Sequence, residues 1–157
     1  MPTLDLTTDI DAPAERVFDL ARCIDLHVTT TAHTGERAVA GVTGGLIGLG
    51  QEVTWEARHL CVRQRLSVRI TQYDRPRVFT DRMVKGAFAR MEHDHHFAPL
   101  PGGGTRMRDV FVYASPLGPL GLLADAMFLK RHLRGLLLRR NAMLKAVAES
   151  QEWKRYV

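Results

Sequence analysis

Five stretches in the middle of the chain alternate between apolar and polar residues, and this alternation constrains the fold more than any other feature. They cover about residues 51–60, 62–73, 77–85, 88–98 and 105–115. Side chains on a strand point alternately to the two faces of a sheet, so each stretch predicts a strand with one buried face. Turn-forming residues separate the last four stretches, which favours consecutive antiparallel strands.

The two ends of the chain add helices and further strands. Residues 3–10, TLDLTTDI, alternate in the same way, and residues 36–41 are also strand-like. A helix is expected over about 13–21, with Asp11 as a cap and Pro13 in the first turn, followed by a short helical turn near 24–27. Residues 120–150 predict one long helix with a single apolar stripe: Leu129, Leu133, Leu136, Leu137, Leu144 and Val147.

This order of elements predicts an α+β fold in which a long C-terminal helix lies across a curved antiparallel sheet of about seven strands. The 157 residues, of which 45% are hydrophobic, suit one domain over residues 1–157. No apolar run reaches the length of a membrane span and no secretory signal opens the chain, so we expect a cytoplasmic protein. Cys23 and Cys61 lie far apart in sequence, which suits free thiols.

The net charge of +5 permits binding to anions, but its distribution matters more. Basic residues gather at 58–69 and 130–141. In the first segment Arg63, Arg65 and Arg69 fall on one strand face, which we expect to be solvated. Neither segment is interleaved with aromatic residues as in stacking platforms for single strands, so we expect no nucleic-acid partner.

The segment GVTGGLIGLG, residues 41–50, joins two expected strands and is both glycine-rich and apolar. It does not match the spacing of a phosphate-binding P-loop. An apolar loop of this kind suits a lid over a binding site, and it suits equally well a packed connection of a hairpin.

The strand MEHDHHF, residues 91–97, carries three histidines on two faces. Alternation places His93 and His95 inward, with Met91 and Phe97, and places the polar residues between them outward. If the PLPGGG turn is centred near residue 101, Asp109 falls opposite His93 and Met107 opposite His95. Asp81 falls beside His93 across the other hairpin. These registers predict a polar row of Asp81, His93 and Asp109 across three strands.

Four interpretations of this row remain open: a structural hydrogen-bond network, an anchor for the polar group of a ligand, a metal site, and a catalytic acid–base pair. A histidine between two carboxylates is expected to hold its proton tightly. Two histidines with carboxylates could hold zinc, but neither an HExxH motif nor a thiolate supports it. We therefore expect no metal and no cofactor.

Several segments resemble the SRPBCC superfamily, the START-like helix-grip fold that includes polyketide cyclases. IDAPAERVFDLA resembles the strand and helix that open members of that superfamily. Other segments resemble a bacterial subgroup of cyclase-like or ligand-binding members to which no single activity is assigned: GLGQEVTWEARHL, FTDRMVKGAF, HDHHF, GTRMRDVFVYASPLGPLG and LLLRRN. The resemblance covers nearly the whole chain, and it carries no universal catalytic motif.

The resemblance implies a deep cavity between the sheet and the last helix, and the strand faces agree with it. The inward apolar residues that would form its wall, or alternatively only core, are Trp55, Phe79, Met83, Met91, Phe97, Met107, Phe111 and Tyr113. The inward polar residues that would anchor a ligand are His59, Gln64, Asp81, His93, His95 and Asp109. Arg140 lies near the apolar stripe of the helix. It could turn inward to an aspartate or an acidic ligand, but snorkelling to solvent is favoured.

Three functions follow as hypotheses. The first is binding of a hydrophobic small molecule that resembles a lipid, polyketide or quinone. The second is a cyclase or dehydratase in which His93 or His95 acts as general base and Asp81 or Asp109 orients it. The third is lipid handling at an anionic membrane, through the basic segment 130–141 and the loop 42–49. Outward Val110 and Val112 suggest a contact surface, so the chain is expected to be a monomer or a homodimer.

Overall fold

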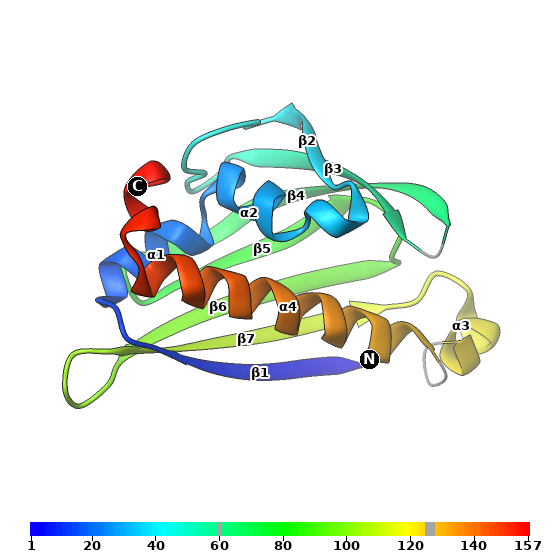
Figure 1. Ribbon diagram of the computed structural model, residues 1–157. Coiled ribbons are helices and arrows are strands. Elements are labelled where there is room, and N and C mark those ends of the chain that lie inside the picture. The colour runs from blue at the N-terminus through cyan, green and yellow to red at the C-terminus, as the bar shows by residue number, and fades with distance from the viewer. Residues whose placement is uncertain (60, 125–127) are drawn as a thin grey trace.

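Seven strands form one antiparallel sheet in the order β1-β7-β6-β5-β4-β3-β2 (Figure 1). The computed structural model describes residues 1–59, 61–124 and 128–157. The strands are β1 (Thr3–Ile10), β2 (Arg37–Gly41), β3 (Glu52–His59), β4 (Val62–Asp74), β5 (Val78–Lys85), β6 (Arg90–Pro99) and β7 (Thr105–Ala114). The helices are α1 (Ala14–Ala21), α2 (Ile24–Thr30), η1 (Ala32–Thr34), α3 (Gly118–Ala124), α4 (Lys130–Glu149) and η3 (Gln151–Arg155).

Helix α4 lies across the concave face of the sheet, and α1 and α2 cover the remainder of that face (Figure 1). Under α1 the ring of Phe18 meets Tyr73, Phe79 and Phe97 edge-on, with ring centres 5.2–5.4 Å apart. Edge-to-face contacts of this kind stabilise aromatic cores beyond simple burial. This aromatic cluster closes one end of the space between the sheet and α4.

The structure confirms the expected helix-grip fold and most of its element boundaries. The expected helix over 120–150 corresponds to two helical elements, α3 and α4, and its residues 125–127 lie outside the described part of the chain. The expected strand over 51–60 ends at His59, and residue 60 is likewise not described. Among the helices described, none is both long and apolar enough to cross a membrane.

The expected inward and outward faces hold on β6 and β7. The inward residues of both strands are buried from Met91 to Phe97 and from Thr105 to Tyr113. On β4, Val62 shares a face with the buried Val68 and Ile70 but is 56% exposed, because it begins the strand beside the turn. Glu56 alternates with the buried Trp55 and Ala57, and its side chain is itself buried, because the guanidinium groups of Arg37 and Arg65 cover it at 2.9 and 2.8 Å. These hydrogen bonds hold the pKa of Glu56 at about 2.

The glycine-rich segment 41–50 is packed against the connection between α1 and α2. Ile24 donates its N–H to the carbonyl of Gly45 at 2.9 Å, and Ile47 donates to the carbonyl of Arg22 at 3.2 Å. The side chain of Ile47 is buried, whereas Leu49 is 62% exposed. The loop therefore folds over the interior with Ile47 as its inward residue.

Candidate functional site

A pocket of about 160 Å³ lies between the sheet, the α1–α2 connection and α4. Its walls are mainly apolar, and one side of its floor is polar. The apolar lining residues are Ala21, Cys23, Ile24, Ile47, Val53, Trp55, Leu66, Val68, Ile70, Phe79, Met91, Phe111 and Leu137. The polar lining residues are Arg22, His27, Glu36, Asp81, His93, His95 and Arg140.

The structure brings most of the expected site residues to this pocket, but not all of them. Trp55, Asp81, His93, His95, Phe111 and Arg140 line it. Phe97 and Tyr113 are buried in the core instead. Asp109 is fully buried behind the two histidines, and His59 lies beside His132 with its Nδ1 3.4 Å from Nε2 of that residue. Of the other residues expected in the wall or as anchors, Phe79 and Met91 line the pocket, whereas Met83, Met107 and Gln64 do not.

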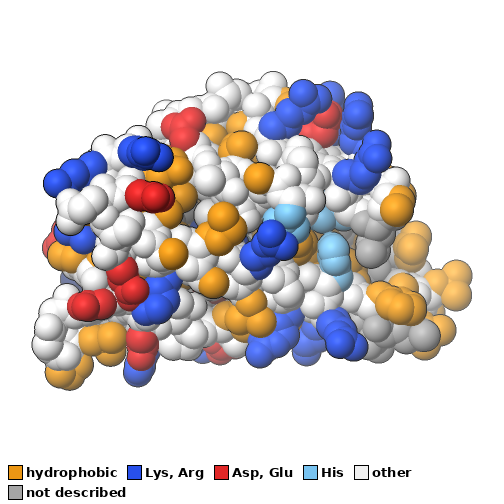
Figure 2. Space-filling view, in the orientation of Figure 1, with side chains coloured by type: hydrophobic (Ala, Val, Ile, Leu, Met, Phe, Trp, Pro, Cys, Tyr) orange, Lys and Arg blue, Asp and Glu red, His pale blue; other side chains and the backbone are white. Residues whose placement is uncertain are grey.

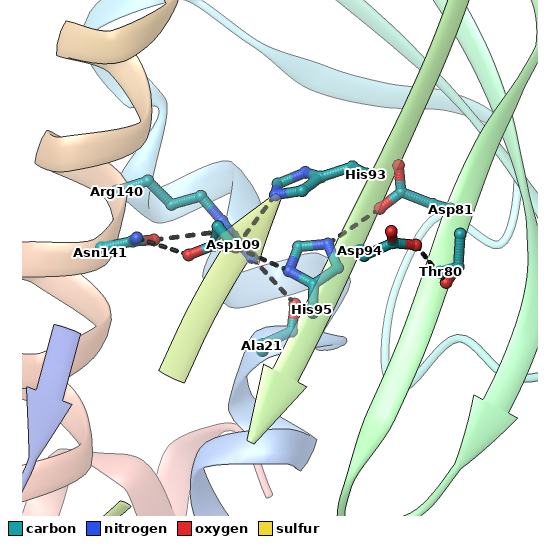
Figure 3. A network of polar contacts seen from close by, with 9 residues as sticks. All are labelled: Ala21, Thr80, Asp81, His93, Asp94, His95, Asp109, Arg140 and Asn141. Carbon is teal, nitrogen blue, oxygen red and sulfur yellow. Dashed lines mark hydrogen bonds and ion pairs between the residues drawn. The ribbon is translucent and has the colours of Figure 1, made fainter. Parts of the chain in front are cut away.

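The polar floor is a connected network of side chains from β5, β6, β7 and α4 (Figure 3). Nε2 of His93 lies 3.0 Å from Oδ1 of Asp109, and Nε2 of His95 lies 3.1 Å from Oδ2 of Asp81. Nδ1 of His95 lies 2.9 Å from Oδ1 of Asp109, within ion-pair distance but outside hydrogen-bond geometry. Asp109 is thus the carboxylate that both histidines share.

The register of one hairpin differs from the sequence prediction. Asp81 pairs with His93 as expected. However, Asp109 pairs with His95, Phe111 pairs with His93, and Met107 pairs with Phe97. The expected row of Asp81, His93 and Asp109 is therefore wrong as a row of directly paired residues. The same side chains still meet, because His93 reaches diagonally to Asp109 on the shared face.

Arg140 and Asn141 complete the network from α4. Arg140 is only 6% exposed, so snorkelling to solvent is wrong. Its guanidinium lies 3.5 Å from Oδ1 of Asp109 and 3.4 Å from the carbonyl of Ala21, both long contacts. Nδ2 of Asn141 donates to Oδ2 of Asp109 at 2.6 Å. Sequence reasoning missed Asn141, although its spacing from Leu144 and Ala148 places it on the buried face of the helix.

The network separates the protonation states of its two histidines. Burial lowers the pKa of His93, the neighbouring His95 lowers it further, and the contact with Asp109 does not compensate. Burial also acts to lower the pKa of His95, but its contacts with Asp109 and Asp81 outweigh this effect and the pKa is raised. Burial acts to raise the pKa of Asp109, but the two histidines hold it well below the usual value. His95 is therefore the histidine that favours the charged form.

These protonation states determine which ring nitrogen of His93 carries the hydrogen. An ionised carboxylate can only accept hydrogen bonds, so Nε2 of His93 carries the hydrogen that it donates to Asp109. Nδ1 of the neutral ring then carries a lone pair. No described residue hydrogen-bonds to this nitrogen, and His93 borders the pocket. The arrangement can accept a proton or a hydrogen bond from a molecule in the pocket.

A second polar group lies elsewhere in the pocket lining, and sequence reasoning did not identify it. Nε2 of His27 contacts Oε1 of Glu36, and the ring of His27 stacks on Trp55 with centres 4.1 Å apart. Burial acts to raise the pKa of Glu36, but His27 outweighs it and the pKa is lowered. These residues come from α2 and from the segment before β2, where no alternation marks an inward side chain.

Comparisons with known proteins agree with this fold. A family model described as polyketide cyclase/dehydrase and lipid transport matches residues 1–149. No protein in the curated set matches the sequence. Among solved structures, protein TTHA0849 from Thermus thermophilus aligns with a TM-score of 0.72 at 21% identity, over 94% of this chain and 99% of that chain.

Two further structures are similar at lower identity. The Zhui aromatase/cyclase from Streptomyces sp. R1128 gives a TM-score of 0.75 at 14% identity, over 94% of this chain and 93% of that one. A START superfamily protein from Mycobacterium smegmatis gives 0.70 at 10% identity, over 94% and 97%. At these identities the likeness shows the fold alone. The family match confirms the SRPBCC resemblance: the chain belongs to the polyketide cyclase/dehydrase and lipid transport family.

Proposed function

We propose that the protein binds a hydrophobic small molecule in the pocket between the sheet and α4. The observation that carries this proposal is the composition of the lining, in which apolar side chains surround a compact polar floor of Asp81, His93, His95 and Arg140. Small-molecule sites usually combine a mainly apolar wall with a few placed polar groups. The family description, which includes lipid transport, supports the same class of ligand.

The size of the pocket limits what it holds in the closed form. A volume of about 160 Å³ is close to that of cavities that bind a benzene-sized molecule, roughly 150 Å³. Lipids, polyketides and quinones require several hundred Å³. A ligand of that size therefore requires Ile47 and its loop to move away from the α1–α2 connection.

The polar floor defines which part of the ligand is anchored there. Nδ1 of His93 and the carboxylate of Asp81 accept hydrogen bonds, so they suit a hydroxyl or phenol. The guanidinium of Arg140, whose contacts are all 3.4–3.5 Å long, suits a carbonyl or carboxylate. A ligand with an apolar body and an oxygen-bearing ring or chain end fits both groups.

Native mass spectrometry of freshly purified protein, followed by denaturing extraction, tests the proposal. We expect a defined small molecule to be retained by the wild type and by Leu138→Phe, because Leu138 is 46% exposed on α4. Leu137→Phe should lose it, because Leu137 lines the pocket and a larger ring occupies the space. If Leu137→Phe retains the molecule as well as Leu138→Phe does, the ligand lies elsewhere and the proposal is wrong.

The geometry of His93 favours a second candidate, an enzyme of the cyclase or dehydratase type. A neutral imidazole held by a carboxylate at one nitrogen, with its other nitrogen free, is the arrangement of a general base. His93 would remove a proton from carbon next to a carbonyl, and Asp109 would orient it. Incubation of the extracted ligand in D₂O tests this step. Wild-type protein should catalyse deuterium uptake at that carbon, and His93→Gln should not.

Exposed leucines favour contact with an anionic membrane as a third candidate. Leu117, Leu120, Leu122, Leu123 and Phe128 are each 61–76% exposed around α3. Figure 2 shows apolar side chains gathered at the α3 end of the molecule, with basic side chains nearby. The first turns of α4 supply Lys130, Arg131 and Arg134, all exposed. Apolar residues flanked by positive charge suit insertion at an anionic lipid surface.

A further inference from the structure

Asp81, His93 and His95 bring three metal-ligand atoms together at the floor of the pocket. One donor atom from each residue lies within 4.8 Å of the other two. Two imidazoles and one carboxylate form a donor set typical of zinc and of non-haem iron(II). We infer that these three residues bind a divalent transition-metal ion, an assignment that goes beyond the proposed function and does not depend on it.

The free atoms of the triad suit coordination. Nε2 of His93 is occupied by Asp109, so His93 would coordinate through Nδ1, to which no described residue hydrogen-bonds. Nε2 of His95 contacts only Asp81 within the described chain, and an ion would take the place of that hydrogen bond at 3.1 Å. Asp81 offers its second oxygen in addition. Its side chain remains 18% exposed because it borders the pocket.

The residues behind the triad provide the supporting contacts that metal sites require. A histidine that binds a metal through one nitrogen usually donates the other N–H to a carboxylate or carbonyl, which fixes the ring. Nε2 of His93 meets this requirement, because it donates to Oδ1 of Asp109 at 3.0 Å. Nδ1 of His95 lies 2.9 Å from the same oxygen, within ion-pair distance but outside hydrogen-bond geometry. Asn141 holds the second oxygen of Asp109 at 2.6 Å. The ring of His93 is therefore held by a hydrogen bond as in metal sites, and the ring of His95 lies against the same carboxylate (Figure 3).

The fixed charges also favour a cation. The network contains two carboxylates, Asp81 and Asp109, and one permanent positive charge, the guanidinium of Arg140. A metal ion would replace the proton that His95 carries in the charged form. That guanidinium also borders the pocket, but its contacts are with Asp109, Asn141 and the carbonyl of Ala21. The pocket beside the three residues leaves room for a further ligand to the ion, which distinguishes an open site from a closed structural one.

Titration of the chelator-treated full chain with Co²⁺ and Zn²⁺ tests the assignment. We expect one equivalent to bind, with visible Co²⁺ absorption bands of a four- or five-coordinate nitrogen–oxygen site. His95→Gln and Asp81→Asn should each weaken binding by on the order of a hundredfold. Asp109→Asn should weaken it by on the order of 10–100-fold through loss of ring orientation. Far-UV circular dichroism establishes which variants are folded.

Two matched variants separate this site from other histidines. His96→Gln changes the exposed neighbour on the outer face of β6, and His59→Gln changes the pair that His59 forms with His132. Both should bind Co²⁺ as the wild type does. The assignment is wrong if no equivalent binds, if folded His95→Gln and Asp81→Asn bind normally, or if His59→Gln is the variant that loses the ion.

Discussion

Asp109 is the residue on which the polar network depends. It is fully buried and accepts contacts from His93, His95, Arg140 and Asn141. Its removal leaves these groups buried without a shared acceptor, and breaking a buried ion pair in this way typically costs about 3–5 kcal/mol. We expect Asp109→Ala to lower the free energy of unfolding by that amount, measured by urea denaturation.

Asp94 provides the control for this prediction. It lies on the outer face of the adjacent strand and accepts one hydrogen bond, from Oγ1 of Thr80 at 2.6 Å. Thr80 also has Oε1 of Gln72 within 3.3 Å, so its hydroxyl keeps a partner after Asp94→Ala. We expect a loss below about 1 kcal/mol for Asp94→Ala. Equal losses for the two variants would contradict the assignment of inward and outward faces.

The pKa values of the two histidines are shifted in opposite directions, so the two rings should carry different charges at the same pH. Since the folded pKa of His95 is raised above 6.5, its stabilising contribution is complete below pH 6.5 and is lost as pH rises through the raised value. The folded pKa of His93 is lowered, so its contribution is present above pH 6.5 and is lost as pH falls through the lowered value. Nitrogen NMR of the imidazoles at pH 6.5 should show a charged His95 and a neutral His93.

His96, the outward neighbour of His95 on the same strand, provides the control for this pH dependence. His95→Gln should abolish the loss of stability above pH 6.5, whereas His96→Gln should retain it, because His96 is exposed. A wild-type stability curve that is flat above pH 6.5, or a His95 ring that is neutral at that pH, would contradict the charge assignment.

Alternation alone predicted which residues of the network point inward, but not how they pair. Asp81, His93, His95 and Asp109 were all placed on the buried face from a period of two. The predicted turn was centred on residue 101, whereas Pro99 pairs with Thr105 and the loop is centred on Gly102. Moving the centre of a hairpin by one residue shifts every pair by two. A shift of two residues leaves each side chain on the same face of its strand, so the residues of the site were predicted correctly although their pairing was not.

At the scale of the element, Gly41 illustrates how closely β2 approaches β3. It has φ of +74°, and a Cβ at this position would lie 2.2 Å from the carbonyl oxygen of Glu52. Gly45 in the following loop has φ of +72° but open space around it. The two glycines thus share a conformation and differ in their surroundings.

Substitution of these two glycines by alanine should lower the free energy of unfolding by different amounts. Gly45→Ala should lose about 1–2 kcal/mol, the cost of the left-handed conformation alone. Gly41→Ala should lose more, because the backbone of β3 must also move. Thermal unfolding of both variants measures the difference. Equal losses would show that β2 moves away from β3 without cost.

The C-terminal helix was only partly predictable. The apolar stripe from Leu129 to Val147 identified α4, and the packing of Leu144 and Ala148 confirms its buried face. The stripe begins at Leu129 and therefore indicated no direction for the side chains of α3. Leu120, Leu122 and Leu123 face solvent instead, so apolar character alone did not mark burial there. A period-based argument assumes that apolar residues face the core, and it fails where they face outward.

For the whole molecule, the exposed leucines predict a salt-sensitive interaction with anionic vesicles. The double variant Leu120→Asp/Leu123→Asp should reduce co-sedimentation with phosphatidylserine vesicles by on the order of tenfold or more, because it places charge in the inserted surface. Val84→Asp, at a residue that is 51% exposed on β5, is the control. Raising the salt concentration should weaken wild-type binding by screening the basic residues.

Other outcomes of that experiment would contradict contact with an anionic membrane. Binding to neutral vesicles alone would remove the role of Lys130, Arg131 and Arg134. A concentration-dependent dimer that dissociates in the double variant, with no vesicle binding by the wild type, would assign the leucines to an interface between two copies of the chain.

The overall fold was predictable from sequence because the sheet and the long helix each have a strong period. The pocket was less predictable from the sequence. Its lining draws on Ile24, His27 and Glu36, which lie in a short helix and a connection where no period indicates direction. Its volume depends on how Ile47 packs, and packing of a glycine-rich loop follows from tertiary contacts rather than from its own sequence.

The pairing of β1 with β7 has a consequence for how the protein is made. Asp5 and Arg108, which bind each other across these strands, are 103 residues apart. At a synthesis rate of about 5–20 residues per second, the first strand leaves the ribosome roughly 5–20 seconds before its partner exists. Throughout that interval the apolar side chains of Leu4, Leu6 and Ile10 on β1 have no partner strand to cover them. The nascent chain therefore requires protection from aggregation until β7 has been synthesised.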